Sequence, residues 1–296
     1  MAIAMTSQCL LCHFKRYLTK AQGLGDEKTA MDFGRAMMQT YLNAPAGVSS
    51  PWFSPQVAEL FKKYYHLGDN QYEEEKRQAN AFAMERLEQM RSMIRQAEDP
   101  ILAGLRLAIL GNYLDFGALQ GQVSFEKMEE MLRQAMEMEL DMEVFASLRQ
   151  ALANGKKLLF LTDNAGEIVM DRLFAEEIQR HHPDLEITFC VRGGLTINDA
   201  TREDAELVGI PFRVIDNGNL VSGTELSMLS REAKEAMDTA DVIISKGMAN
   251  TETLYGCGYP IYYAFLVKCV HFEHVFQKPM MTPMLVKDPG KLTADS

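Results

Sequence analysis

The sequence lacks long apolar runs, has few cysteines and shows no secretory signal. A membrane-spanning helix needs about 18 consecutive apolar residues, and no segment of the 296 residues reaches that length. The five cysteines are an odd number and are scattered along the chain, so they do not form a disulfide framework. The first residues have no basic segment ahead of an apolar one, unlike a signal peptide. We therefore expect a cytoplasmic protein with reduced thiols and no membrane partner.

The sequence also lacks an excess of basic charge. Its 30 Lys and Arg residues are outnumbered by 41 Asp and Glu residues, which gives a formal net charge of −11. An acidic surface repels nucleic acid, so we expect no nucleic-acid partner. A small anionic substrate is compatible with this charge if a bound cation or a nearby lysine offsets it. There is no Walker loop, no G-x-G-x-x-G loop and no Ser-His-Asp set.

Up to about residue 150 the pattern of apolar residues is helical. Between residues 73 and 97, apolar residues recur at steps of three and four, which predicts one helix with a single apolar face. Asp99 and Pro100 are typical of the start of another helix. The same pattern recurs between residues 124 and 150. We predict an all-α domain over residues 1–150.

After Gly155, short apolar runs alternate with stretches that suit helices. The runs are 157–161, 186–191, 212–215, 241–245 and 261–267. The helical stretches between them are 167–181, 201–208 and 225–239. Short strands separated by helices are typical of βαβ units with helices on both faces of the sheet. We predict a Rossmann-like α/β domain over residues 151–296, with three α/β/α layers and a mostly parallel sheet.

Polar residues follow the predicted strands, at the edge where open α/β sheets bind ligands. They are Asp163, Asn164, Gly166 and Glu167 after the first strand, Asn198 and Asp199 after the second, and Ser245 and Lys246 at the end of the fourth. Each has a simpler interpretation. Asp and Asn are common helix caps, and a lysine is commonly a surface residue. Their coincidence on one edge favours a ligand site.

These residues form an ordered set of motifs that resembles a known family. L-T-D-N-A-G-E, R-G-G followed by N-D-A-T, D-N-G and S-K-G-M-A-N occur in the order seen in the metal-dependent damage-control phosphatases, a family long catalogued as a domain of unknown function. The upstream G-N-Y-L-D-F-G and the pair Cys9 and Cys12 are similar to features of its microbial branch. The resemblance covers nearly the whole chain and implies a Rossmann-like domain together with a helical domain.

The resemblance implies a role for several residues. Asp163, Asn164 and Asp199 match the ligands of a divalent metal ion, and Lys246 matches a lysine that contacts the substrate phosphate. Glu167 lies in the same loop as Asp163 and Asn164, so we expect it beside the phosphate or the attacking water. Members of the family hydrolyse small phosphorylated metabolites, including sugar phosphates and phosphopantetheine-type compounds. We therefore expect a metal-dependent phosphoric monoester hydrolase acting on such a metabolite.

Further residues are candidates for the walls of this site. Gly166, Asn198 and Ser245 lie at the predicted strand ends and are candidates for phosphate binding. Asn112 and Asp115, in the Gly-flanked upstream segment, are candidates for the wall of the substrate cleft, with a helix break as the alternative.

The ligand set predicts the metal and the reaction. Oxygen ligands suit Mg²⁺ or Mn²⁺, and a partly open site also takes Co²⁺ or Ni²⁺. Water would attack the metal-held phosphate in line with the leaving alkoxide. An aspartyl-phosphate on Asp163 is the competing mechanism. It usually needs a second Asp two residues later, whereas position 165 is Ala.

Two other classes of function remain open at this stage. A methyltransferase using S-adenosylmethionine would need a glycine-rich turn after the first strand, where this sequence has a single glycine, Gly166. A non-catalytic metabolite- or metal-binding protein would use the Met-rich helices as a partner surface. The pair Cys9 and Cys12 alone does not supply the four ligands of a zinc site, so two small apolar residues on a helix are the simplest interpretation.

Overall fold

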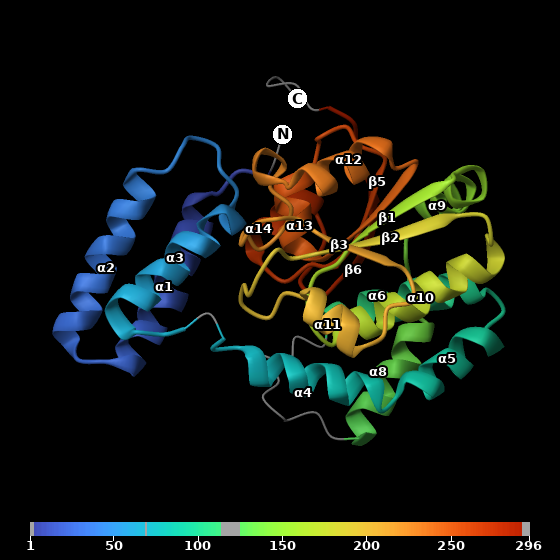
Figure 1. Ribbon diagram of the computed structural model, residues 1–296, viewed down its shortest axis with the longest axis horizontal. Helices are drawn as coiled ribbons and strands as arrows, with labels where there is room; N and C mark the ends of the chain where they lie inside the picture. Colours follow the sequence, from blue (N-terminus) through green and yellow to red (C-terminus); the bar gives the residue numbers. More distant parts are fainter. Residues whose placement is uncertain (1–2, 69, 114–124, 292–296) are drawn as a thin grey trace.

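The structure is a computed structural model that describes residues 3–68, 70–113 and 125–291. Its centre is a six-stranded sheet with helices on both faces (Figure 1). The strands are β1 (Lys157–Leu161), β2 (Glu186–Val191), β3 (Arg213–Asp216), β4 (Val242–Lys246), β5 (Ile261–Leu266) and β6 (Pro283–Lys287). Their order is β3-β2-β1-β4-β5-β6, with β1 to β5 parallel and β6 antiparallel to β5. The predicted mostly parallel sheet is confirmed.

The inner strands are buried on both faces, which is why their sequences are continuous apolar runs. One face packs against α6 (Pro100–Tyr113), α9 (Met142–Asn154) and α10 (Glu167–His181). The other face packs against α12 (Arg231–Thr239), α13 (Gly247–Leu254) and α14 (Val270–Phe276). A short helix, η2 (Leu226–Met228), precedes α12. The three-layer α/β/α arrangement is therefore confirmed (Figure 1).

Further helices cover the outside of α6 and α10. They are α4 (Glu73–Met84), α5 (Leu87–Gln96), α8 (Phe125–Met136) and α11 (Arg202–Leu207). The prediction of one helix over residues 73–97 is wrong, because the chain turns between α4 and α5. At this turn the Arg86 guanidinium donates to the Phe82 carbonyl (2.8 Å) and stacks over the Phe82 ring. It thereby supplies a donor to a carbonyl in the last turn of α4.

The helical pattern over residues 124–150 also corresponds to two helices. α8 ends at Met136 and α9 begins at Met142. Asp141 caps α9, because one of its carboxylate oxygens accepts from the backbone N–H groups of Glu143 and Val144, each at 3.0 Å. Periodicity alone does not reveal such a break, since both helices repeat apolar residues with a helical period, although α9 packs against the sheet and α8 against the outside of α6 and α10.

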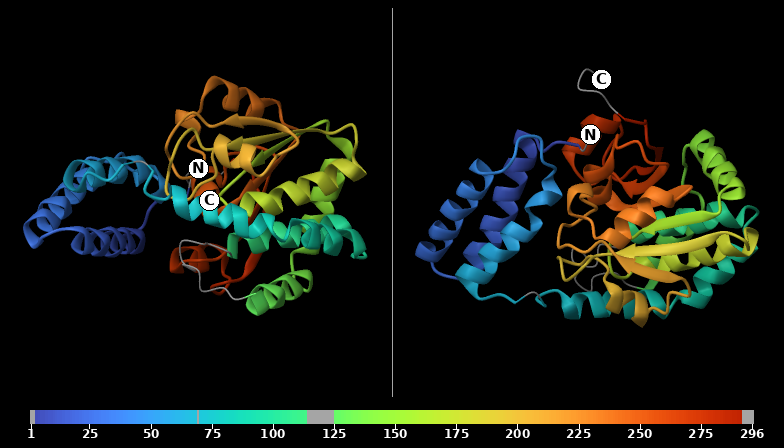
Figure 2. Two further views of the ribbon diagram at one scale, coloured as in Figure 1. Left: turned by 60° about the horizontal axis from the view of Figure 1, so that its bottom comes forward. Right: turned by 45° about the horizontal axis from the view of Figure 1, so that its top comes forward.

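The first helices form a separate cluster. They are α1 (Ser7–Leu24), α2 (Glu27–Leu42), the short η1 (Ser50–Phe53) and α3 (Ser54–Tyr65). Their shared core includes Ala21, Phe33 and Phe61, and the rings of Phe33 and Phe61 are 4.7 Å apart. Figure 2 shows these helices to one side of the sheet. The predicted domain boundary at residue 150 lies shortly before β1. The helix α6 comes before this boundary in the sequence, but it shares a core with the sheet.

No helix in the described ranges is both long enough and apolar enough to span a bilayer.

Candidate active site

The polar strand ends meet between β1 and β4, where the order of the sheet reverses. Such a switch point is the usual ligand crevice of an open α/β sheet. Asp163 follows β1 and Gly247 follows β4. Gly247 has φ +79°, and a Cβ at this position would lie 1.9 Å from Asp163 Oδ2. Only glycine therefore lets the start of α13 approach this carboxylate.

Two amide groups bridge two buried carboxylates in this crevice. Asn112 Nδ2, from the end of α6, donates to Asp163 Oδ2 (2.9 Å) and to Glu167 Oε2 (3.1 Å). Asn164 Nδ2 donates to the same two oxygens, at 2.8 and 3.0 Å. Asp163 and Glu167 are 7% and 1% exposed. The structure thus brings together four of the predicted site residues.

The loop after β2 places Asp199 beside this group. Asn164 and Asp199 form an isolated β-bridge. Ala165 N–H donates to the carbonyl of Asn198 at 2.9 Å, so Asn198 supports the loop through its backbone. Asp199 Oδ2 accepts from Arg192 Nε at 2.5 Å, and Asp199 Oδ1 accepts from Ser222 Oγ at 3.2 Å. These contacts hold the two loops that carry the predicted metal ligands against each other.

The crevice concentrates negative charge. Burial raises the pKa of Asp163 well above its usual range, and the nearby carboxylates of Glu167 and Asp199 raise it further. Burial also raises the pKa of Asp199, although the Arg192 guanidinium opposes this shift. Buried acids that repel one another in this way are stabilised by a cation.

The donor set fits a hard divalent cation. In the described ranges no group of three or more His, Cys, Asp or Glu side chains forms a metal site. Two carboxylates, Asp163 and Asp199, and the amide of Asn164 are the candidate ligands. Mg²⁺ is typically bound through one or two carboxylates, and waters and substrate phosphate complete its shell. The residues present therefore fit such an ion only with oxygens from outside the protein.

Lys246 lies beneath the carboxylates and does not face the crevice. Its side chain is 0% exposed, and its Nζ donates to Glu167 Oε1 (2.8 Å), Asp171 Oδ1 (2.6 Å) and the Ala108 carbonyl (2.7 Å). These acceptors use all three of its N–H groups. In place of the predicted phosphate contact, the structure shows an internal ion pair.

The ion pair determines the charge of its acids. Burial, the largest single effect, raises the pKa of Glu167. The charge and hydrogen bond of Lys246, with the Asn112 hydrogen bond and the charge of Lys268, together lower the pKa of that carboxyl below its usual value. For Asp171, burial is the larger effect, and its pKa is raised to about 7. Glu167 therefore stays ionised at neutral pH next to Asp163.

The structure also gives two other predicted phosphate ligands surroundings within the protein. Ser245 is fully buried in β4, where alternate side chains point to opposite faces, and its Oγ has no hydrogen-bond partner among the described residues. The Gly166 N–H donates to Asn80 Oδ1 at 2.7 Å. Asp115 lies outside the described residues.

A family model matches most of this chain. The model of the damage-control phosphatase ARMT1-like domain matches residues 5–279. The chain belongs to this family.

Similar proteins are found in archaea. An uncharacterized protein of Methanocaldococcus jannaschii is 30% identical over 90% of this chain and 90% of its own. A protein named damage-control phosphatase from Archaeoglobus fulgidus is 34% identical over 75% of this chain and 77% of its own. The crystal structure of a DUF89 family protein from Pyrococcus horikoshii superposes with a TM-score of 0.80 at 24% identity, covering 96% of this chain and 99% of that one. This last similarity supports the fold.

The candidate site contacts a helix that the motifs do not include. Asn80, on α4, accepts from the Gly166 N–H and donates to Asp204 Oδ1 (2.8 Å). Lys76, one turn earlier on α4, pairs with Asp204 Oδ2 at 2.7 Å, and both side chains are buried. Asp204 caps α11, the helix that follows the Asp199 loop. Sequence reasoning missed these residues because polar positions one turn apart on a helix are ordinarily solvated.

Lys268 is another residue that sequence reasoning missed. It follows β5, its backbone N–H donates to Met248 Sδ in α13 (3.2 Å), and its side chain is partly exposed. Its charge lowers the pKa of both Asp163 and Glu167. A lysine directly after the predicted strand 261–267 was a usable signal, of the same kind as the one that pointed to Lys246.

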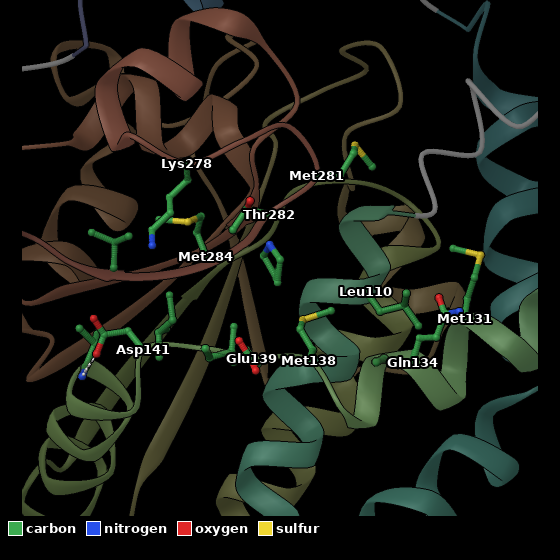
Figure 3. A pocket seen from close by; sticks show the side chains of 16 residues that line it. Leu110, Met131, Gln134, Met138, Glu139, Asp141, Lys278, Met281, Thr282 and Met284 are labelled. Carbon is green, nitrogen blue, oxygen red and sulfur yellow. Dashed lines mark hydrogen bonds between the residues drawn. The ribbon is translucent and has the colours of Figure 1, made fainter.

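Two cavities are lined by different parts of the chain. A cavity of about 1140 Å³ lies among α6, α8, α9 and β6, and contains none of the residues that surround Asp163. Figure 3 shows Lys278, Thr282 and Met284 on one side of it and Leu110 and Met138 on the other. A smaller cavity, of about 210 Å³, lies between the first helices and the loop that leads to Asp199.

Proposed function

We propose that the protein is a metal-dependent phosphatase that hydrolyses phosphomonoesters of small metabolites such as sugar phosphates or phosphopantetheine-like compounds. The observation that carries the proposal is the convergence of Asp163, Asn164 and Asp199 at the switch point of the sheet, in a buried and negatively charged crevice. The names of the archaeal relatives support the reaction class.

The three residues would hold the ion through oxygen atoms, with Mg²⁺, Mn²⁺, Co²⁺ or Ni²⁺ as candidates. A bound divalent ion supplies Lewis-acid charge neutralisation to a phosphate oxygen. Hydrogen bonds from Arg192 and Ser222 orient the Asp199 carboxylate. Asn112 donates to both Asp163 and Glu167 and so holds these two carboxylates side by side.

The chain's own residues then serve the attack of water on phosphorus. Glu167, kept ionised by Lys246, offers a carboxylate oxygen beside Asp163 that can accept a hydrogen bond and a proton from the attacking water. The new P–O bond forms as the bond to the alkoxide breaks, which releases an alcohol and inorganic phosphate. Attack by Asp163 itself is disfavoured because position 165 is Ala, which cannot serve as the partner acid.

The test is phosphate release by metal-stripped protein. We expect no release from a panel of sugar phosphates and phosphopantetheine compounds without metal, and restored release when Mg²⁺, Mn²⁺, Co²⁺ or Ni²⁺ is added back. Release that survives chelation would contradict metal dependence. Absence of release by protein that is folded and binds metal would favour a non-catalytic binding protein, and binding of S-adenosylmethionine without metal would favour a methyltransferase.

Lys268 is expected to hold the substrate phosphate. Replacing it with methionine should lower kcat/KM by about 10- to 100-fold, because a hydrogen bond to a charged group contributes roughly 1.5–3 kcal/mol. Lys268→Arg should retain part of the activity. Lys278→Met, at an exposed lysine that lines the larger cavity, is the matched control and should be neutral. Equal steady-state kinetics for Lys268→Met and the control would show that Lys268 does not contact the substrate.

A further inference from the structure

The smaller cavity is lined by two different parts of the fold. Tyr17 and Lys20 of α1 and Phe61 of α3 contribute one wall, and Thr196 and Ile197 of the loop after β2 contribute another. Its volume of about 210 Å³ suits part of a small metabolite rather than a macromolecular segment. The reaction proposed above assigns no role to it.

One loop contributes both to this cavity and to the candidate site. Ile197 precedes Asp199 by two residues, so their Cα atoms lie within about 7 Å of each other. Ser54 also lines the cavity, and its Oγ accepts from the Ser222 N–H at 2.8 Å. The Ser222 hydroxyl in turn donates to Asp199 at 3.2 Å. The cavity and the candidate metal ligand Asp199 are therefore linked through one loop and one hydrogen-bond chain.

The backbone of the shared wall is strained. Ile197 has φ +47°, a left-handed conformation that is rare for a β-branched residue. Such strain persists where the surroundings over-determine it, and it is concentrated at ligand sites. Here it occurs in the segment common to the cavity and the Asp199 loop.

Lys20 places a positive charge inside an aromatic wall. Its Nζ donates to Gln71 Oε1 (2.7 Å) and to the Tyr72 hydroxyl (2.8 Å), both neutral acceptors. It also lies 5.0 Å from the centre of the Phe61 ring and 4.7 Å from that of Tyr72. These contacts hold the ammonium group, and among the described residues they use two of its three N–H groups. Glu59, the other charged residue of the lining in the described part of the chain, is exposed.

We propose that this cavity binds the organic end of the substrate and selects phosphomonoesters that carry a carboxylate, which Lys20 binds. The aromatic and aliphatic walls accept an apolar carbon frame between the phosphate and the carboxylate. The inference rests on the proposed phosphatase function, and it adds a substrate class and a residue that determines specificity.

The experiment compares esters that differ in one charge. Phenyl phosphates with a para carboxylate, carboxymethyl or carboxyethyl group are each paired with the corresponding carboxamide. We expect the wild type to prefer the carboxylate about tenfold in kcat/KM at one or more of these lengths, as one charge-assisted hydrogen bond predicts. Lys20→Met should abolish this preference and leave turnover of the carboxamide within about twofold. Lys63→Met, at an exposed lysine of α3 that does not line the cavity, is the matched control and should keep the preference.

Absence of a preference at every length, or a preference that survives in Lys20→Met, would overturn the inference while leaving the phosphatase function intact. Absence of turnover on every ester with every metal would instead refute the proposed function. Binding of the corresponding non-hydrolysable benzylphosphonates, measured by calorimetry, tests the cavity independently of turnover. Equal affinity for carboxylate and carboxamide there would also overturn the inference.

Discussion

Asp163→Asn should remove phosphate release and make the metal-free protein more stable. Loss of a ligand carboxylate should lower kcat/KM by about 10³-fold or more, on the scale of losing a group that stabilises transition-state charge. Stability should rise because Asp163 is buried near the carboxylates of Glu167 and Asp199. An amide at this position removes that repulsion, and it retains an oxygen that can accept from Asn112 and Asn164.

The pH dependence of this stabilisation follows from the direction of the pKa shift. A carboxyl whose pKa is raised in the folded state contributes stability below its ordinary pKa of about 4. That contribution is lost as the pH rises through the raised value. The Tm of metal-free Asp163→Asn should therefore exceed that of the wild type by a margin that grows from pH 4 towards pH 8. Saturating metal should reverse the order, because it binds and stabilises the wild type preferentially.

Calorimetry across this pH range, with and without metal, gives the comparison. Asp184→Asn, at an exposed aspartate of the same half of the chain, is the control and should change neither Tm nor activity. A metal-free wild type more stable than Asp163→Asn at neutral pH would contradict the charged crevice described here. Unchanged phosphate release by Asp163→Asn would exclude Asp163 as a required ligand.

Lys246→Met should have the opposite effect on stability. The side chains of Lys246, Glu167 and Asp171 are at most 1% exposed and form one ion cluster. Removal of one partner from a buried ion pair costs about 3–5 kcal/mol, because the remaining charge has no compensation. For a domain of this size we expect Tm to fall by roughly 10 °C.

A second substitution separates this role from phosphate binding. Lys246→Met combined with Asp171→Leu should recover part of the lost stability, since one of the two uncompensated carboxylates is gone. Lys234→Met, which removes an exposed ion pair with Asp238, should change the free energy of unfolding by no more than about 0.5 kcal/mol. If Lys246→Met keeps the wild-type Tm but raises KM for the phosphate ester, Lys246 is a substrate ligand after all. Thermal denaturation and steady-state kinetics on the same variants decide between the two roles.

The architecture of the sheet was predictable from local patterns. β1 and β2 begin and end where the apolar runs 157–161 and 186–191 do, because strands buried on both faces have sequences that are apolar throughout. The helix over 167–181 was also predictable from a local pattern. A helix that covers a sheet repeats its apolar residues with a helical period. β6 was not predicted, because its antiparallel pairing with β5 leaves no βαβ signal in the sequence.

The approach of Asp163, Asn164 and Asp199 also followed from the sequence alone. Parallel strands joined by helices bring their carboxyl ends to one edge, so residues that follow neighbouring strands must lie near one another. The alternation of strands and helices therefore predicted the α/β fold, and the polar residues that follow the strands predicted where the site lies.

Only the tertiary structure decided what lies around these residues. Lys246 contacts the Ala108 carbonyl across 138 positions of sequence, and Asn80 reaches Gly166 across 86. Whether a lysine at a strand end faces the crevice or the core depends on which acceptors the covering helices present to it. Those acceptors come from α6 and α10, which pack together through apolar faces. The pattern of apolar residues does not determine which polar groups of the two helices lie opposite Lys246. The sequence determined the sheet and the edge that carries the candidate site, and long-range packing determined which side chains are available there.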